Sequence, residues 1–154
     1  MVKVLFVCHG NICRSTMAES VLTDMLRKKG IQNVLVSSAA THTDEIGNPP
    51  HYGTREKLQR EGIFVVPHRA RLMTRADGTE YDYIIGMDEE NLRHMRRILG
   101  AAFENKISLL LDYTAHPRAI ADPWYTGNFD ETYRDVVDGC EGLLHYLREK
   151  NLLS

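Results

Sequence analysis

Residues 2–15 read VKVLFVCHGNICRS, and no other part of the chain constrains the architecture as strongly. The run from Val2 to Val7 is short and almost continuously apolar, as expected of a strand buried on both faces of a parallel sheet. A loop follows, and Ser15 to Lys29 then place apolar residues on one helical face before Gly30 provides a stop. A buried strand that leads into an amphipathic helix predicts an α/β fold.

The rest of the chain repeats this alternation, which predicts one domain spanning residues 1–154 with a four-stranded parallel sheet and helices on both faces. In such sheets the site lies beyond the carboxyl ends of the strands. The expected elements are strands at Val34 to Ser38, Tyr81 to Met87 and Ile107 to Leu111, a helix ending near Gly62, a helix capped by Asp88, a long loop from Asp112 to Asn128, and a last helix from about Asp130 to Lys150.

Composition narrows the functional class. The 154 residues carry a formal net charge of -2 with acids and bases interspersed, which argues against nucleic-acid binding. No apolar run approaches the roughly 18 residues of a membrane span, so no membrane association is expected. Three cysteines do not form a disulfide framework, and a cytoplasmic location is expected.

The loop after the first strand has the spacing Cys-x5-Arg-Ser, from Cys8 to Ser15. Five residues, His9, Gly10, Asn11, Ile12 and Cys13, can curl so that successive backbone N–H groups surround an anion, and the helix N-terminus adds its positive dipole end. Gly10 suits a tight or positive-φ backbone. Arg14 can hold two phosphate oxygens with its planar fork. These N–H groups, the helix N-terminus and Arg14 favour the thiolate form of Cys8, which is the nucleophilic form. The Ser15 hydroxyl could donate a hydrogen bond to this sulfur.

The other two cysteines have different expectations. Cys13 is either a small buried hydrophobe or a redox partner that traps oxidised Cys8 as a disulfide, and the residues leave both open. Cys140 lies on the apolar face of the last helix and is expected in the core.

A leaving-group acid is the second requirement for this chemistry, because a positioned acid speeds departure of an oxyanion by about 10²–10⁴-fold. Asp122 precedes Pro123 in the long loop, and Trp124 and Tyr125 follow and could wall an aromatic substrate. The competing interpretation of Asp122 is an ordinary turn residue before a proline.

Together these residues resemble the low-molecular-weight protein tyrosine phosphatases over essentially the whole chain. Besides the first loop, the matching segments in order are Ser38-Ala39-Ala40-Thr41, Glu45-Ile46-Gly47-Asn48-Pro49-Pro50, His68-x-Ala70-Arg71, Met87-Asp88-Glu89-x-Asn91-Leu92 and Asp122-Pro123-x-Tyr125.

The resemblance implies hydrolysis of phosphotyrosine in proteins through a cysteinyl phosphate, with Cys8, Arg14 and Asp122 as catalytic residues and no metal or cofactor. It implies that inorganic phosphate and other oxyanions inhibit. It further implies that Asn11 supports the loop through hydrogen bonds with Ser38, His68 and Ser15.

Two positions depart from the family pattern. Thr16 stands where the family usually has a proline after the serine. Threonine suits the first turn of a helix. Asp44 stands where the family usually places an aromatic wall residue, so substrate preference is affected; Ile12, Trp124 and Tyr125 remain as expected walls. At an exposed rim, Asp44 would repel acidic flanks and favour basic ones.

Three other functions compete with this interpretation. Phosphoarginine phosphatases of the same fold carry Thr where this chain has Ile12. Arsenate reductases need further downstream cysteines, and residues 14–139 contain none. A phosphocysteine carrier or a phosphotyrosine-binding module would not turn over, and Arg14 with Asp122 argues against a carrier.

Overall fold

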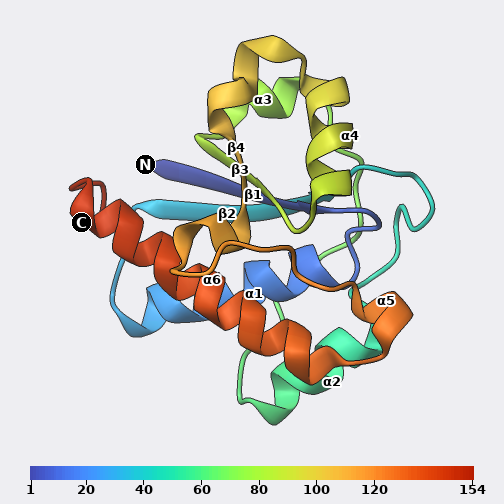
Figure 1. The fold of residues 1–154 in the computed structure, drawn as a ribbon. Coiled ribbons are helices and arrows are strands. Elements are labelled where there is room, and N and C mark those ends of the chain that lie inside the picture. The colour runs from blue at the N-terminus through green and yellow to red at the C-terminus, as the bar shows by residue number, and fades with distance from the viewer.

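The sheet is the centre of the molecule. The computed structural model describes residues 1–154 and contains four strands, β1 (Val2–Cys8), β2 (Val34–Ala40), β3 (Tyr83–Gly86) and β4 (Ile107–Leu109). They lie in the order β2-β1-β3-β4, and each neighbouring pair is parallel. This confirms the predicted four-stranded parallel sheet (Figure 1).

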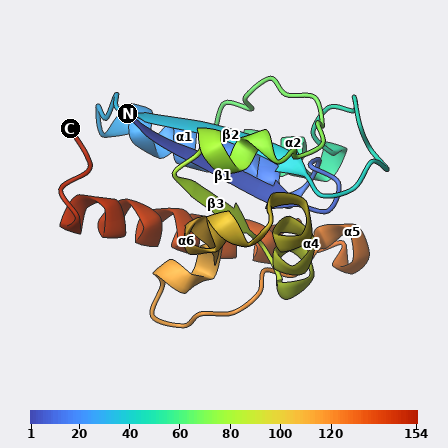
Figure 2. The same ribbon diagram turned by 90° about the horizontal axis from the view of Figure 1, so that it is seen from above.

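Helices cover both faces of the sheet, as predicted. Figures 1 and 2 show α1 and α6 on one side of the strands and α3 and α4 on the other. The helices are α1 (Arg14–Lys28), α2 (Tyr52–Arg60), α3 (Ala76–Glu80), α4 (Glu89–Leu99), α5 (Pro123–Thr126) and α6 (Phe129–Glu149), with 3₁₀ segments η1 (Ala101–Lys106) and η2 (Leu110–Tyr113).

The short elements are where the predictions were wrong. The expected loop from Asp112 to Asn128 contains α5, and the fourth strand ends two residues early because Leu110 begins η2. Helix α3 and η1 were not predicted. Elements of four to six residues are too short to show a helical period in the sequence.

Strand β1 supplies apolar side chains to two separate cores. Val4, Phe6 and Cys8 belong to the cluster that packs with α1 and α6, while Leu5 and Val7 belong to the cluster that packs with α4. Apart from Cys8, which is 3% exposed, these side chains are completely buried. Burial of each large apolar side chain contributes about 1.5–3 kcal/mol, so the strand that carries Cys8 at its end is firmly held.

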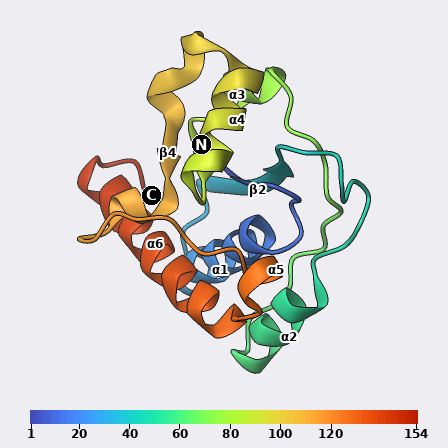
Figure 3. The ribbon, with the colours of Figure 1, turned by 45° about the vertical axis from the view of Figure 1, so that its right-hand side comes forward.

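The carboxyl ends of the strands bring distant segments together. Cys8 ends β1 beside Ala40 of β2, and Asp88, which caps α4 as predicted, follows β3. Figure 3 shows α5 beside the amino-terminal end of α1 and close to α2. No helix is long and apolar enough to cross a membrane.

Candidate active site

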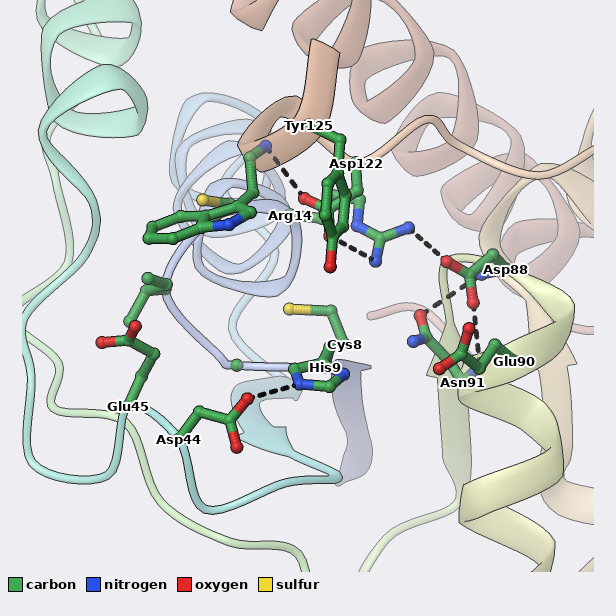
Figure 4. A pocket seen from close by; sticks show the side chains of 14 residues that line it. Cys8, His9, Arg14, Asp44, Glu45, Asp88, Glu90, Asn91, Asp122 and Tyr125 are labelled. Carbon is green, nitrogen blue, oxygen red and sulfur yellow. Dashed lines mark hydrogen bonds and ion pairs between the residues drawn. The ribbon is translucent and has the colours of Figure 1, made fainter. Parts of the chain in front are cut away.

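A pocket of about 400 Å³ opens at this edge of the sheet. Figure 4 shows the Cys8 sulfur between the Arg14–Asp122 pair and the His9–Asp44 pair. Its walls come from the Cys8–Arg14 loop, the segment after β2, the start of α4 and the segment around α5. The lining residues are Cys8, His9, Gly10, Ile12, Cys13, Arg14, Asp44, Glu45, Asp88, Glu90, Asn91, Asp122, Trp124 and Tyr125.

The Cys8–Arg14 loop presents a row of free backbone donors. No hydrogen bond within the chain uses the backbone N–H of any residue from 9 to 13 as its donor. Backbone N–H groups in a packed region normally find an acceptor. Five consecutive N–H groups without one, next to the first turn of α1, form a site suited to an anion.

The turn in this loop is made by Asn11, not Gly10. Asn11 has φ of 59°, whereas Gly10 is not among the residues with positive φ, so of the two alternatives expected for Gly10 the positive φ is excluded. Asparagine tolerates this region because its side chain forms local hydrogen bonds. Gly10 does allow a close approach: a Cβ there would lie 3.3 Å from Cγ of Glu45.

Arg14 is anchored so that one edge of its guanidinium remains available. Nη1 donates to the Asp88 carboxylate at 2.7 Å and to the Ile120 carbonyl at 2.8 Å. Nε is buried without a partner, and Nη2 has only a 3.4 Å contact with Asp122. The Nε–Nη2 edge is therefore the part that can hold two oxygens of a tetrahedral anion.

The charge of Arg14 is favoured despite its burial. Its side chain is only 2% exposed, and burial alone would lower the pKa. The negative charges of Cys8, Asp122 and Asp88 outweigh burial and raise the pKa of Arg14. The guanidinium is thus a fixed positive charge beside the sulfur.

Below the pocket, a chain of hydrogen bonds reaches the Cys8 sulfur. Asn11 Nδ2 donates to Ser15 Oγ at 2.8 Å and to Ser38 Oγ at 2.9 Å. Ser15 Oγ lies 3.1 Å from Cys8 Sγ and, having accepted from Asn11, has its own proton free for the sulfur. Asn11 Oδ1 accepts from His68 Nε2 at 2.6 Å. The structure thus brings together the four residues expected to support the loop.

Glu19 continues this network and was missed in the sequence. Its carboxylate accepts from Ser38 Oγ at 2.6 Å and lies 3.7 Å from His68 Nδ1. Burial raises the pKa of Glu19, while the Ser38 hydroxyl opposes the shift. A signal was present: Glu19 stands four residues after Ser15, on the same buried face of α1.

Asp122 faces the same pocket from the end of the long segment. Its Oδ1 accepts from the Trp124 N–H at 3.1 Å and caps α5, whereas Oδ2 lies 3.4 Å from Arg14 Nη2. The side chain is 21% exposed. Asp122 is thus held by the short helix, with one oxygen directed toward Arg14.

The predicted wall residues surround the mouth. Ile12 is buried, whereas Trp124 and Tyr125 are exposed. Asp44 is not a free side chain in solvent, because its Oδ2 pairs with His9 Nε2 at 2.8 Å. This hydrogen bond lowers the pKa of Asp44. The partner of Asp44 was not predicted.

Cys13 lines the pocket but is almost completely buried. Burial, followed by the charges of Cys8 and Asp122, raises the pKa of its thiol. All three cysteines are free, and Cys140 lies in the core as expected. At neutral pH Cys13 is therefore a protonated thiol in the same pocket as Cys8.

The pocket also holds carboxylates that the sequence interpretation did not assign to it. Asp88 was predicted only as a helix cap, yet it also fixes Arg14. Glu45 and Glu90 line the mouth. No three His, Cys, Asp or Glu side chains are grouped so that they could hold a metal ion.

Comparisons with known proteins give similar chains and similar folds. The family model described as low molecular weight phosphotyrosine protein phosphatase matches residues 3–152. The chain is 43% identical to the low molecular weight protein-tyrosine-phosphatase YfkJ of Bacillus subtilis, over 99% of this chain and 100% of that protein. The crystal structure of YfkJ superimposes with a TM-score of 0.92, covering 97% of this chain and 96% of that one. A Drosophila arginine phosphatase structure gives a TM-score of 0.87 at 32% identity, covering 96% and 98%.

Proposed function

The chain belongs to the low molecular weight phosphotyrosine protein phosphatase family, and we propose that this protein-tyrosine-phosphatase works through Cys8, Arg14 and Asp122. The observation that carries the proposal is the set of unpaired donors in the loop that lines the pocket together with Cys8. Five backbone N–H groups and the Arg14 Nε have no acceptor within the chain. A bound phosphate would supply acceptors for this set.

In the first step the Cys8 thiolate attacks phosphorus, the S–P bond forms and the bond from phosphorus to the tyrosine oxygen breaks. Asp122, protonated, gives its proton to the departing phenolate oxygen. Ser15 donates its hydroxyl to the sulfur at 3.1 Å, which stabilises the thiolate before attack.

In the second step water attacks phosphorus in the cysteinyl phosphate. The Asp122 carboxylate takes a proton from that water, the S–P bond breaks, and inorganic phosphate and the Cys8 thiolate are released. Arg14 holds two phosphate oxygens in both steps. The N–H groups of residues 9–13 hold the remaining charge, which explains why phosphate and similar oxyanions should inhibit.

Substrates are tyrosine-phosphorylated proteins, whose ring enters between Ile12 and the aromatic pair Trp124 and Tyr125. The phosphate must reach the bottom of the pocket, where Cys8 is only 3% exposed, and a long aryl side chain reaches deeper than serine. Ile12→Thr should shift the preference toward phosphoarginine, and an unchanged ratio would show that Ile12 does not set it. Three free cysteines favour a reducing location, so we place the enzyme in the cytoplasm.

The test measures kcat/KM on phosphotyrosine, phosphoserine and phosphoarginine peptides in the presence of EDTA. We expect phosphotyrosine to be preferred, Cys8→Ser to be inactive, and a cysteinyl phosphate to be trapped by rapid acid quench. Activity that disappears in EDTA and returns with a metal would contradict this mechanism, as would full activity of Cys8→Ser.

A further inference from the structure

His51 lies where the phosphate-binding loop, α2 and the segment that carries Asp122 meet. Its backbone N–H donates to the Ile12 carbonyl at 2.7 Å, which ties it to the loop around the phosphate site. Its Nδ1 accepts from the Gly53 N–H at 3.0 Å and caps α2. Figures 1 and 3 show the start of α2 next to α5.

The His51 ring contacts the Asp122 segment at two places. It meets the Trp124 ring edge-on, with centroids 5.7 Å apart and planes at 77°. It stacks on Phe129, with centroids 5.4 Å apart and planes at 13°. Trp124 belongs to α5 and is two residues after Asp122, and Phe129 is the first residue of α6, so one ring contacts both α5 and the start of α6.

Phe129 is itself fixed in place by the glycine beside His51. A Cβ on Gly53 would lie 2.4 Å from the Phe129 ring, so the ring rests directly on the backbone of α2. Because Gly53 also donates to His51, the ring stack and the helix cap form one unit. This unit gives the short, largely exposed α5 a rigid support.

We propose that His51 is a positioning residue that holds the Asp122 segment against the phosphate-binding loop. It acts through Trp124, whose N–H Asp122 caps, and so keeps Asp122 within reach of the leaving-group oxygen above Cys8. The inference rests on the proposed role of Asp122 as the acid. A displacement of about 1 Å in a catalytic group can lower the rate by about 10²-fold, so this support matters for the first step.

The two roles of His51 can be separated by substitution. His51→Asn keeps a side chain that caps helices well but removes the ring. His51→Phe keeps a ring but removes the acceptor for Gly53. His145 is a matched control, because it is an exposed histidine on α6 whose partner is Glu149 and which does not line the pocket.

The assay compares kcat/KM for p-nitrophenyl phosphate with that for phenyl phosphate. The phenolate is the poorer leaving group and depends more on the acid. We use the ratio of kcat/KM for p-nitrophenyl phosphate to kcat/KM for phenyl phosphate. This ratio is independent of how much enzyme is folded, so partial unfolding of a variant does not affect it. Asp122→Asn calibrates the response.

We expect Asp122→Asn to raise this ratio most and His51→Asn to raise it by about 2- to 12-fold, the range expected for loss of an aromatic contact. His51→Phe should stay within about twofold of the wild type but melt at a lower temperature. His145→Asn should change neither quantity.

Trp124 provides a second readout because it is the only tryptophan in the chain. Time-resolved fluorescence anisotropy should show faster motion of Trp124 in His51→Asn than in the wild type or His51→Phe. If His51→Asn matches His145→Asn in both measurements while Asp122→Asn raises the ratio, the positioning role is wrong. If Asp122→Asn does not raise the ratio, the proposed acid is wrong, and the role of His51 falls with it.

Discussion

Replacing Asn11 by glycine and by alanine separates the two things that this residue does. Asn11 is completely buried, has φ of 59° and forms four side-chain hydrogen bonds, to Ser15, Ser38, His68 and the backbone N–H of Arg71. Glycine adopts this backbone freely, whereas alanine is strained there. Both substitutions remove all four hydrogen bonds.

The magnitudes follow from these contacts. Each hydrogen bond contributes about 0.5–1.5 kcal/mol to stability, so both variants should lose about 2–6 kcal/mol of unfolding free energy. Alanine adds about 1–2 kcal/mol of left-handed strain. Alanine also leaves the unfolded chain less conformational freedom than glycine does. This difference favours the folded state by about 0.4–1 kcal/mol and offsets part of the strain. Asn11→Ala should therefore be less stable than Asn11→Gly by about 1 kcal/mol, or about 2–4 °C in Tm.

Urea unfolding measures the stabilities, and kcat/KM on p-nitrophenyl phosphate measures the effect on the loop. Asn151 is the control, because it has φ of 58°, is exposed and lies after α6, far along the chain from the pocket residues. Its alanine and glycine variants should differ by a similar amount and keep full activity. Both Asn11 variants should lose activity, since Ser15 is no longer oriented toward the sulfur.

One result would refute the argument about strain: Asn11→Ala at least as stable as Asn11→Gly, while the Asn151 pair shows the expected difference. Wild-type kcat/KM in both Asn11 variants would refute the argument about the network.

Three further predictions concern the pocket. Arg14→Lys should be nearly as inactive as Arg14→Ala, because lysine cannot supply two parallel donors; if it kept more than about a tenth of kcat/KM, two-point binding would be the wrong account. After mild peroxide, thiol reductant should restore the wild type more fully than Cys13→Ser, through a disulfide with Cys8. Because the pKa of Cys13 is raised, its thiolate fraction is small at neutral pH and grows as the pH rises, so this protection should increase with pH; equal recovery at all pH values would exclude it. Asp44→Tyr should raise kcat/KM on a small aryl phosphate by about 2- to 12-fold and reduce any preference for basic flanks at low salt, and no change in either would show that Asp44, paired with His9, is not part of the wall.

The sheet, the long helices and the position of the loop between β1 and α1 could be predicted because their signals are local. The apolar run of β1, the helical period of α1 and the Cys-x5-Arg spacing each lie within a few residues. Asp88 as a cap of α4 was a local signal too, and it is confirmed.

What could not be predicted depends on contacts between distant residues. Asp88 lies 74 positions from Arg14, and Asp44 lies 35 positions from His9, so neither pairing leaves a trace in spacing. The left-handed conformation of Asn11 was not predicted, for a related reason. Glycine is the usual choice, but the buried network around Asn11 overrides that preference.

The proposed catalytic residues and the proposed substrate walls have opposite degrees of solvent exposure. Cys8, Asn11, Arg14 and Ser15 are nearly or fully buried, while Trp124 is 56% and Tyr125 84% exposed. Substitutions at exposed positions usually change stability by less than about 0.5 kcal/mol, whereas buried polar networks tolerate little change. A lineage that carries this fold could therefore acquire new substrates by drift at the mouth alone, with its reaction and its folding stability left intact.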